Sequence, residues 1–139
     1  EMSSDYVSLS PTKKNLLPNA KEILDYLKGK YKMIIITNGF EEIQSVKLSS
    51  SGISNYFETV ITSEKVGFKK PAREIFDYAL RGRFHENHEV LMIGDNLNTD
   101  IKGANNAGIH SAYFNPLRKP HNHTTTYEIA DLIELKSIL

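Results

Sequence analysis

The stretch Val90–Asp100 reads VLMIGDNLNTD and joins a short apolar strand to two closely spaced carboxylates. Its first four residues are apolar throughout rather than alternating, which is typical of a parallel strand covered on both faces. The strand leads through Gly94 into Asp95, and Asp100 follows five positions later at a predicted helix start. Two carboxylates at a sheet edge suit Mg²⁺, which takes one or two protein carboxylates together with water and phosphate oxygens. In the alternative interpretation, Asp95 only caps a turn and Asp100 only favours the helix start.

Strand and helix patterns alternate along the rest of the chain. The further strands are predicted at Lys32–Thr37, Thr59–Thr62 and Ser111–Phe114. Apolar residues at helical spacing predict helices at Asn19–Lys30, Glu41–Ser51, Pro71–Leu80, Thr99–Ala107 and Glu128–Leu139. This order predicts an α/β layered domain with a parallel sheet and right-handed crossovers. In such sheets, ligands bind beyond the carboxyl ends of the strands.

Length and composition exclude several classes of protein. The chain has 139 residues, which suits one domain, and 17 acidic against 17 basic residues. The zero net charge argues against a nucleic-acid-binding protein, and the absence of cysteine excludes disulfides and Cys-ligated metals. No apolar run is long enough for a membrane span and no signal peptide opens the chain, so we expect a cytoplasmic protein. Because Glu1 precedes Met2, the chain is expected to be a piece of a longer protein.

A hydroxyl and an amide follow the strand at Lys32–Thr37. Thr37, Asn38 and Gly39 precede a predicted helix, whose first backbone amides can hold an anion. The three residues are therefore candidate phosphate-binding groups. The alternative is that Thr37 or Asn38 is an ordinary helix N-cap.

A lysine follows the strand at Thr59–Thr62 in a constrained position. Lys70 precedes Pro71, which pushes its backbone toward an extended conformation at a helix entry. A cation is unfavourable at a helix start unless an anion shares the site. We therefore select Lys70 as a catalytic and substrate-binding candidate and treat Lys69 as a surface residue, although both could be solvated lysines.

Three segments resemble the haloacid dehalogenase-like (HAD) superfamily, and specifically its magnesium-dependent phosphatases. They are MIIITNGF at 33–40, KKPAREIF at 69–76 and IGDNLNTDIKGANNAG at 93–108, in the order found in the family. With the helix entry LLPNA at 16–20, the resemblance covers nearly the whole chain and is nearest to the 5′-nucleotidase-like branch. It implies a three-layer, Rossmann-like core with a parallel sheet.

The resemblance also implies roles for individual residues. Thr37 would hydrogen-bond the transferred phosphoryl group, with Asn38 beside it, and Lys70 would steady the phosphoryl charge and the nucleophile. Asp95 would bind Mg²⁺, and Asp100 would support the metal site. Gly94-Asp95 stands where dehalogenases proper tend to carry Ser-Asn, which favours phosphate chemistry over carbon–halogen cleavage.

The first motif of the family is absent from the sequence. That motif is a pair of aspartates two positions apart, one the nucleophile and the other an acid/base. No two aspartates here have that spacing; they are Asp5, Asp25, Asp77, Asp95, Asp100 and Asp131. Residues 1–15 are interpreted as the tail of a mostly missing helical cap, and residues 16–139 as a partial core. The sheet is then expected to lack its central, nucleophile-bearing strand, between the strands at 32–37 and 90–93.

An empty central position would leave two strands with unpaired backbone groups, at about 1–3 kcal/mol for each buried group. We therefore expect an N-terminal segment or a second chain to complete the sheet. In the complete protein we predict magnesium-dependent hydrolysis of a small phosphorylated metabolite, such as a nucleotide, through an aspartyl-phosphate; this chain alone should be inactive. The alternative is a non-catalytic phosphate- or metal-binding module on the same fold. A receiver or nucleotide-binding domain is disfavoured, because no glycine-rich phosphate loop follows any strand.

Residues near the C-terminus have no predicted role in the site. Tyr113 is predicted to lie in the core, Asn115 just past a strand end, and His121 and His123 in a polar surface loop.

Overall fold

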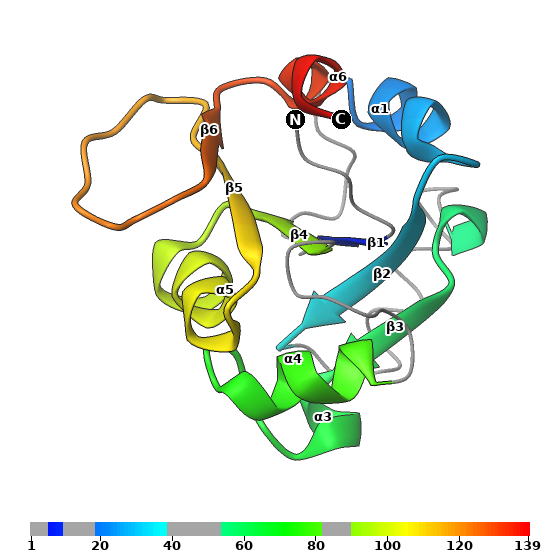
Figure 1. Cartoon of the computed structure of the whole chain (residues 1–139), viewed down its shortest axis with the longest axis vertical. Helices are drawn as coiled ribbons and strands as arrows, with labels where there is room; N and C mark the ends of the chain where they lie inside the picture. The colour runs from blue at the N-terminus through cyan, green and yellow to red at the C-terminus, as the bar shows by residue number, and fades with distance from the viewer. Residues whose placement is uncertain (1–5, 10–18, 39–53, 82–89) are drawn as a thin grey trace.

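The computed structural model describes residues 6–9, 19–38, 54–81 and 90–139, and they form a three-layer α/β domain (Figure 1). A parallel sheet of six strands has the order β3-β2-β1-β4-β5-β6. The strands are β1 (Tyr6–Leu9), β2 (Lys32–Thr37), β3 (Thr59–Thr62), β4 (Val90–Gly94), β5 (His110–Phe114) and β6 (Tyr127–Ile129). The predicted fold class is confirmed.

Helices cover both faces of the sheet, as Figure 1 shows. One face carries α1 (Ala20–Leu27) and α6 (Leu135–Ile138), with the 3₁₀ turns η1 (Ser54–Tyr56) and η4 (Leu132–Glu134) nearby. The other face carries α3 (Ser63–Val66), α4 (Arg73–Leu80) and α5 (Lys102–Ala107), the last preceded by a π-helical turn, η3 (Leu97–Ile101). Because helices cover both faces of the sheet, a ligand can reach it only at the ends of the strands.

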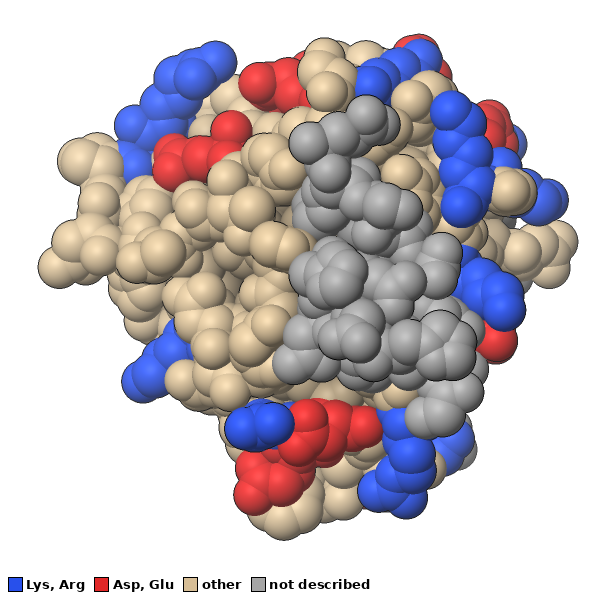
Figure 2. All heavy atoms as spheres, viewed as in Figure 1, with Lys and Arg blue, Asp and Glu red and all other residues tan. Residues whose placement is uncertain are grey.

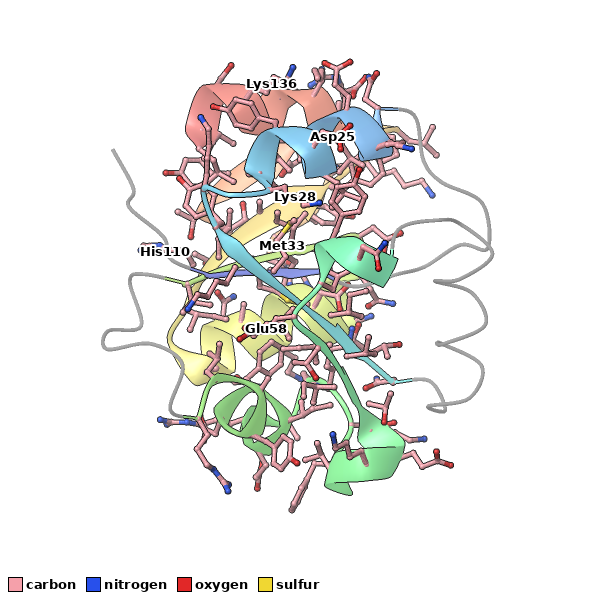
Figure 3. The ribbon with its side chains drawn as sticks, turned by 90° about the vertical axis from the view of Figure 1, so that its right-hand side faces the viewer. Asp25, Lys28, Met33, Glu58, His110 and Lys136 are labelled. Atoms are coloured by element: carbon pink, nitrogen blue, oxygen red, sulfur yellow. The ribbon has the colours of Figure 1, made fainter. Side chains whose placement is uncertain are left out.

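Alternate residues of the central strands enter two separate cores. On the α4/α5 face, Ile34, Ile36 and Met92 lie in one buried cluster. On the α1/α6 face, Met33 and Leu91 lie in the other, and Figure 3 shows Met33 in the middle of the molecule. Because both faces of each strand are buried, an alternating polar pattern would place polar groups in a core, which explains the uninterrupted apolar runs.

The central position of the sheet is occupied. β1 pairs in parallel with β2 on one side and with β4 on the other, so Tyr6–Leu9 stands where we expected an empty place. Residues 6–9 therefore contribute a central strand, and the expectation that the described sheet lacks its middle strand is wrong. The physical reason is the cost of unpaired backbone groups. β2 and β4 would each leave a row of buried N-H and C=O groups without partners, and pairing with β1 satisfies both rows. Its sequence, YVSL, contains no aspartate.

The predicted C-terminal helix at 128–139 is also wrong in its first part. Tyr127–Ile129 forms β6, which pairs with β5, and helix begins only with η4 and α6. Asp131 starts η4 through a capping box, in which its side chain accepts from Ile133 N and Glu134 reaches back to the N-H of Asp131. The cap places the start of the helical segment after Asp131, whereas the spacing of apolar residues from 128 onward predicted one continuous helix.

The remaining predicted elements are present with shifted ends, or lie outside the described residues. The helix predicted at 19–30 runs over Ala20–Leu27, and that predicted at 71–80 over Arg73–Leu80. The helix predicted at 99–107 is divided between η3 and α5. The helix predicted at 41–51 lies outside the described residues. Among the helices that the structure describes, none has the length and apolar character needed to cross a bilayer.

Charged side chains of both signs occur on the face shown in Figure 2. Lys and Arg gather toward its rim with Asp and Glu among them, and neutral residues fill much of the described surface between. The equal totals of acidic and basic residues are thus not separated into single-sign fields on this face.

Candidate active site at the carboxyl edge of the sheet

Thr37 and Asp95 stand at the same level of the carboxyl edge. Leu9 of β1 pairs with Ile35 on one side and Ile93 on the other. Thr37 and Asp95 each lie two residues beyond these partners, Thr37 as the last residue of β2 and Asp95 directly after β4. With strands about 4.8 Å apart, their backbones are separated by roughly 10 Å across the central strand. The hydroxyl and the first carboxylate therefore flank the end of the central position.

Lys70 and Asp100 form a buried ion pair beside this edge. The Nζ atom of Lys70 lies 2.5 Å from Oδ1 of Asp100, and their side chains are 3% and 0% exposed. Backbone N-H of Asn96 donates to Oδ2 of Asp100 at 3.3 Å, and the hydroxyl of Thr99 lies 3.4 Å from Oδ1. Because two charges are removed from water, the pair persists only with this close geometry and these added hydrogen bonds.

Gly94 provides the space into which the Asp100 carboxylate fits. A Cβ built on Gly94 would lie 2.6 Å from the carboxyl carbon of Asp100, closer than real Cβ contacts come. Between these residues, the side chain of Asn96 accepts from the backbone of Asn98 at 2.9 Å and of Thr99 at 3.1 Å. The turn is therefore capped by Asn96 rather than by Asp95, and it folds Asp100 back over the end of β4.

Asn38 holds the backbone of Lys70 at two points. Its Oδ1 accepts from the N-H of Lys70 at 2.7 Å, and its Nδ2 donates to the carbonyl of Lys70 at 3.2 Å. Asn106 of α5 donates to the carbonyl of Pro71 at 3.1 Å, and the Lys70-Pro71 peptide bond is cis. The amide of Asn38 thus connects the end of β2 to the lysine that precedes α4, a contact that the interpretation as a phosphate-binding residue did not include.

The structure brings most of the predicted site residues to one edge. Lys70 contacts Asp100 directly and Asn38 through its backbone, and it is 5% exposed, so the interpretation of Lys70 as a solvated lysine is wrong. Thr37 and Asp95 share the carboxyl edge. Gly39 lies outside the described residues.

Two asparagines of the site were missed in the sequence. Asn96 caps the η3 turn and Asn106 holds Pro71. The first has a recognisable signal, since an asparagine directly before a helical turn can accept from the free N-H groups two and three residues further on. The second has none, because nothing in the sequence shows that α5 lies against the entry to α4.

The donor set fits Mg²⁺ in part. Asp95 is partly exposed at the strand end, as a direct ligand would be. Both oxygens of the Asp100 carboxylate already have protein donors, which suits a supporting role rather than direct coordination. Within the described ranges, no group of three or more His, Cys, Asp or Glu residues could hold a metal. An ion here would take its other ligands from water, from a phosphate and from groups beyond those ranges.

Comparison with known proteins shows the family to which the chain belongs. The family model described as haloacid dehalogenase-like hydrolase matches residues 5–114. Pyrimidine 5′-nucleotidase YjjG of Escherichia coli is 38% identical over 126 residues, which cover 88% of this chain and 56% of that protein. Glyceraldehyde 3-phosphate phosphatase of Methanothermobacter thermautotrophicus is 37% identical over 130 residues, covering 88% of this chain and 58% of the relative.

A solved structure has the same fold at similar identity. The HAD-hydrolase YfnB of Bacillus subtilis, solved with bound magnesium, superposes with a TM-score of 0.83 at 35% identity, covering 90% of this chain and 55% of that one. The chain thus spans little more than half the length of these relatives. With the family model matched over most of its residues and the fold shared, the chain belongs to the haloacid dehalogenase-like hydrolases.

Proposed function

We propose that the complete protein hydrolyses phosphate monoesters with the help of Mg²⁺, and that this chain provides the groups that bind phosphate and metal. The observation that carries the proposal is the buried pair of Lys70 and Asp100 beside Thr37 and Asp95. The names of the relatives support it, since they include a nucleotidase and a sugar-phosphate phosphatase. We accordingly propose a small phosphorylated metabolite, nucleotides included, as the substrate, and the cytoplasm as the location.

The chain's own residues have distinct tasks in this proposal. The hydroxyl of Thr37 donates to a phosphoryl oxygen, and the ammonium of Lys70 offsets negative charge that grows in the transition state. Asp100 holds the ammonium group of Lys70 in place, and Asn38 fixes the backbone of Lys70. Asp95 would hold Mg²⁺, which when bound neutralises phosphoryl charge and aligns the ester. Since these groups are fixed before substrate arrives, they need little rearrangement during reaction.

The nucleophile must come from residues outside this sequence. No pair of aspartates with the family spacing is present, and β1 itself has none. We propose that a preceding segment or a second chain supplies a strand with that pair between β2 and β4, in the place that β1 holds here. Its carboxylate would attack phosphorus as the bond to the leaving oxygen breaks, and water would then release phosphate from the aspartyl-phosphate.

The test is a phosphatase assay of the complete protein on phosphate monoesters, with Mg²⁺ and with a chelator. We expect turnover only with Mg²⁺. Lys70→Ala should lower kcat by about 10²–10³-fold, as expected when a charge-stabilising group is removed. Lys69→Ala is the matched control, because Lys69 is an exposed neighbour, and should leave kcat unchanged. Equal effects of both substitutions would contradict the assignment.

A second candidate is a non-catalytic module that binds phosphate or metal. It is favoured by one observation, the occupation of the central strand position by a segment without a carboxylate. If the complete protein binds inorganic phosphate or Mg²⁺ in calorimetry but turns over no phosphate monoester, this second function replaces the first.

A further inference from the structure

The dipeptide Lys70-Pro71 has three backbone polar groups, and each has a side-chain amide as a partner. The N-H of Lys70 donates to Oδ1 of Asn38 at 2.7 Å, and the carbonyl of Lys70 accepts from Nδ2 of Asn38 at 3.2 Å. The carbonyl of Pro71 accepts from Nδ2 of Asn106 at 3.1 Å, and a proline has no N-H. Two asparagines, one directly after β2 and the other on α5, therefore hold the backbone that bears the site lysine.

One continuous helical segment, formed by η3 and α5, contacts this lysine region at two points. Asp100 in η3 lies 2.5 Å from Nζ of Lys70, and Asn106 in α5 binds the residue that follows Lys70. η3 runs directly into α5, so both contacts come from the same stretch of helical backbone. The hydrogen bond from Asn106 therefore fixes where the backbone of Lys70 stands relative to the carboxylate of Asp100.

The packing of α5 against α4 supports the contact made by Asn106. In Figure 1, α5 lies beside α4. A Cβ built on Gly103 of α5 would lie 2.6 Å from Cζ of Phe76 and 3.3 Å from Cα of Pro71, so α5 comes very close to the start of α4. Asn106 lies three residues beyond Gly103 and hence on the same side of the helix. Helix packing, rather than a loop, thus brings the amide of Asn106 to the carbonyl of Pro71.

We propose that Asn106 is a positioning residue of the candidate active site: it holds Pro71 so that the ammonium group of Lys70 stays against Asp100 and is directed at the phosphoryl group. The proposal rests on the function proposed above, in which Lys70 offsets phosphoryl charge. Asn106 acts through Pro71 and Lys70 rather than on the substrate. A displaced ammonium group should slow the reaction more than it weakens substrate binding, because its charge matters most in the transition state.

Asn105 provides a control from the same helix. It is exposed, as Asn106 is, and its Nδ2 donates to the carbonyl of Thr124, on the loop between β5 and β6, at 3.0 Å. Asn105→Ala and Asn106→Ala therefore each remove one hydrogen bond from an exposed amide of α5 to a backbone carbonyl. Only Asn106→Ala removes a contact with the segment that bears Lys70.

The first measurement is steady-state hydrolysis of p-nitrophenyl phosphate by the complete protein. Asn106→Ala should lower kcat by about 10–10²-fold, as small misplacements in an active site do, with little change in KM. Asn105→Ala should leave both constants unchanged. Asn106→Asp has nearly the same shape but cannot donate when ionised, and it should lower kcat at least as far. The same kcat in Asn105→Ala and Asn106→Ala, or a change in KM alone, would overturn the positioning role.

The second measurement does not depend on catalysis. Urea unfolding compares Asn106→Ala in the wild type with the same change in a Lys70→Met, Asp100→Leu background, where no ion pair remains to be misplaced. Asn106→Ala should lower the urea midpoint less in that background, and Asn105→Ala should lower it equally in both. Equal shifts for Asn106→Ala would contradict the inference. If the shifts differ but the wild-type protein does not hydrolyse p-nitrophenyl phosphate, the proposed function fails, whereas the role of Asn106 in placing Lys70 against Asp100 stands.

Discussion

Lys70 is almost fully buried, and its ammonium group lies 2.5 Å from the carboxylate of Asp100. Such a pair adds little to stability compared with an apolar pair of similar volume, but breaking it leaves one charge buried without compensation. The geometry therefore indicates a pair kept for what the ammonium group does.

Replacing only one member of the pair tests this interpretation. Lys70→Met should lower the free energy of unfolding by about 3–5 kcal/mol, because Asp100 stays buried and uncompensated. Lys70→Met with Asp100→Leu should recover much of that loss. Urea unfolding followed by circular dichroism measures both, with Lys69→Met as the exposed control. A double variant that is less stable than the single one would contradict the argument.

Asn38 gives a second test at the same scale. Asn38→Ala removes both hydrogen bonds to the backbone of Lys70, at about 1–2 kcal/mol of unfolding free energy. In the complete protein it should also lower kcat with less effect on KM, because the lysine is displaced from the reacting group. Asn55→Ala is the control for both measurements, because Asn55 is an exposed residue of η1. A change in KM alone would favour direct substrate binding by Asn38.

Asp131 predicts a dependence of stability on pH. Its pKa is lowered from 3.8 by the hydrogen bond from Ile133 N and then by that from Asn19, whose Nδ2 lies 2.9 Å away. A carboxyl whose pKa is lower when folded stabilises the protein above its unfolded pKa and ceases to do so as pH falls through the folded value. The stability difference between wild type and Asp131→Asn should therefore be constant near neutral pH and shrink below pH 3.8. Urea titrations from pH 7 to 3 would check this, and a difference that grows with acid would contradict it.

Sequence reasoning identified residue types better than residue partners. Lys70, Asp95 and Asp100 were found because each follows a strand, and parallel strands end at one edge. The way the loops cross that edge decides two contacts of Lys70. These are its ion pair with Asp100 and the two hydrogen bonds between Asn38 and its backbone. Spacing along the chain contains no information on such crossings.

At the scale of the elements, α4 and α5 pack so closely that a side chain at Gly103 would overlap α4. A Cβ on Gly103 of α5 would lie 2.6 Å from Cζ of Phe76 and 3.3 Å from Cα of Pro71. The two helices can therefore come this close only while position 103 has no side chain. This contact also places Asn106 against Pro71.

Gly103→Ala should therefore destabilise the protein although alanine favours helix. Overpacking of this kind costs about 1–3 kcal/mol, against a gain in propensity of up to about 1 kcal/mol. Lys102→Ala, exposed on the same helix, is the control and should be nearly neutral. Adding Phe76→Leu should reduce the penalty of Gly103→Ala. Thermal unfolding measures the series, and a more stable Gly103→Ala would contradict the packing argument.

Elements with one clear periodicity were predicted, and elements whose form depends on neighbours were not. Residues 33–36 of β2 and 90–93 of β4 are apolar without interruption, as expected for central parallel strands buried on both faces. β6 is three residues long and exists because β5 offers it an edge. The spacing of Ile129, Leu132, Ile133 and Leu135 suits one helix, but Asp131 and Glu134 form a cap within it.

At the scale of the whole molecule, β1 determines whether the sheet is continuous. It is the one described strand that pairs with β4 on one side and β2 on the other. The prediction of a gap came from treating the polar segment before residue 16 as external to the core. A four-residue run in a polar segment has no distinctive pattern, and its pairing is decided by the strands that it joins.

A matched pair of proline substitutions tests this central position. Val7 lies in β1, which pairs on both sides, and Val60 lies in β3 at the edge of the sheet. Val7→Pro should be destabilising by about 3 kcal/mol or more, and Val60→Pro by less, because proline is tolerated at edges and not in central strands. Urea unfolding of the two variants gives the comparison. Equal penalties, or a silent Val7→Pro, would show that β1 does not hold the centre of the sheet in solution.

The parallel pairing of Tyr6 with Val90 sets an order of events during synthesis. β1 leaves the ribosome before both of its partners, and one of them, β4, is made only after β2 and β3. Pairs so distant along the sequence form slowly, since a long loop must close first. Until then β1 has an unsatisfied side, as an exposed strand edge has, and such edges are where newly made chains associate wrongly. The middle of the finished sheet is thus completed only once β4 has been made, although the strand at its centre is made before both of its partners.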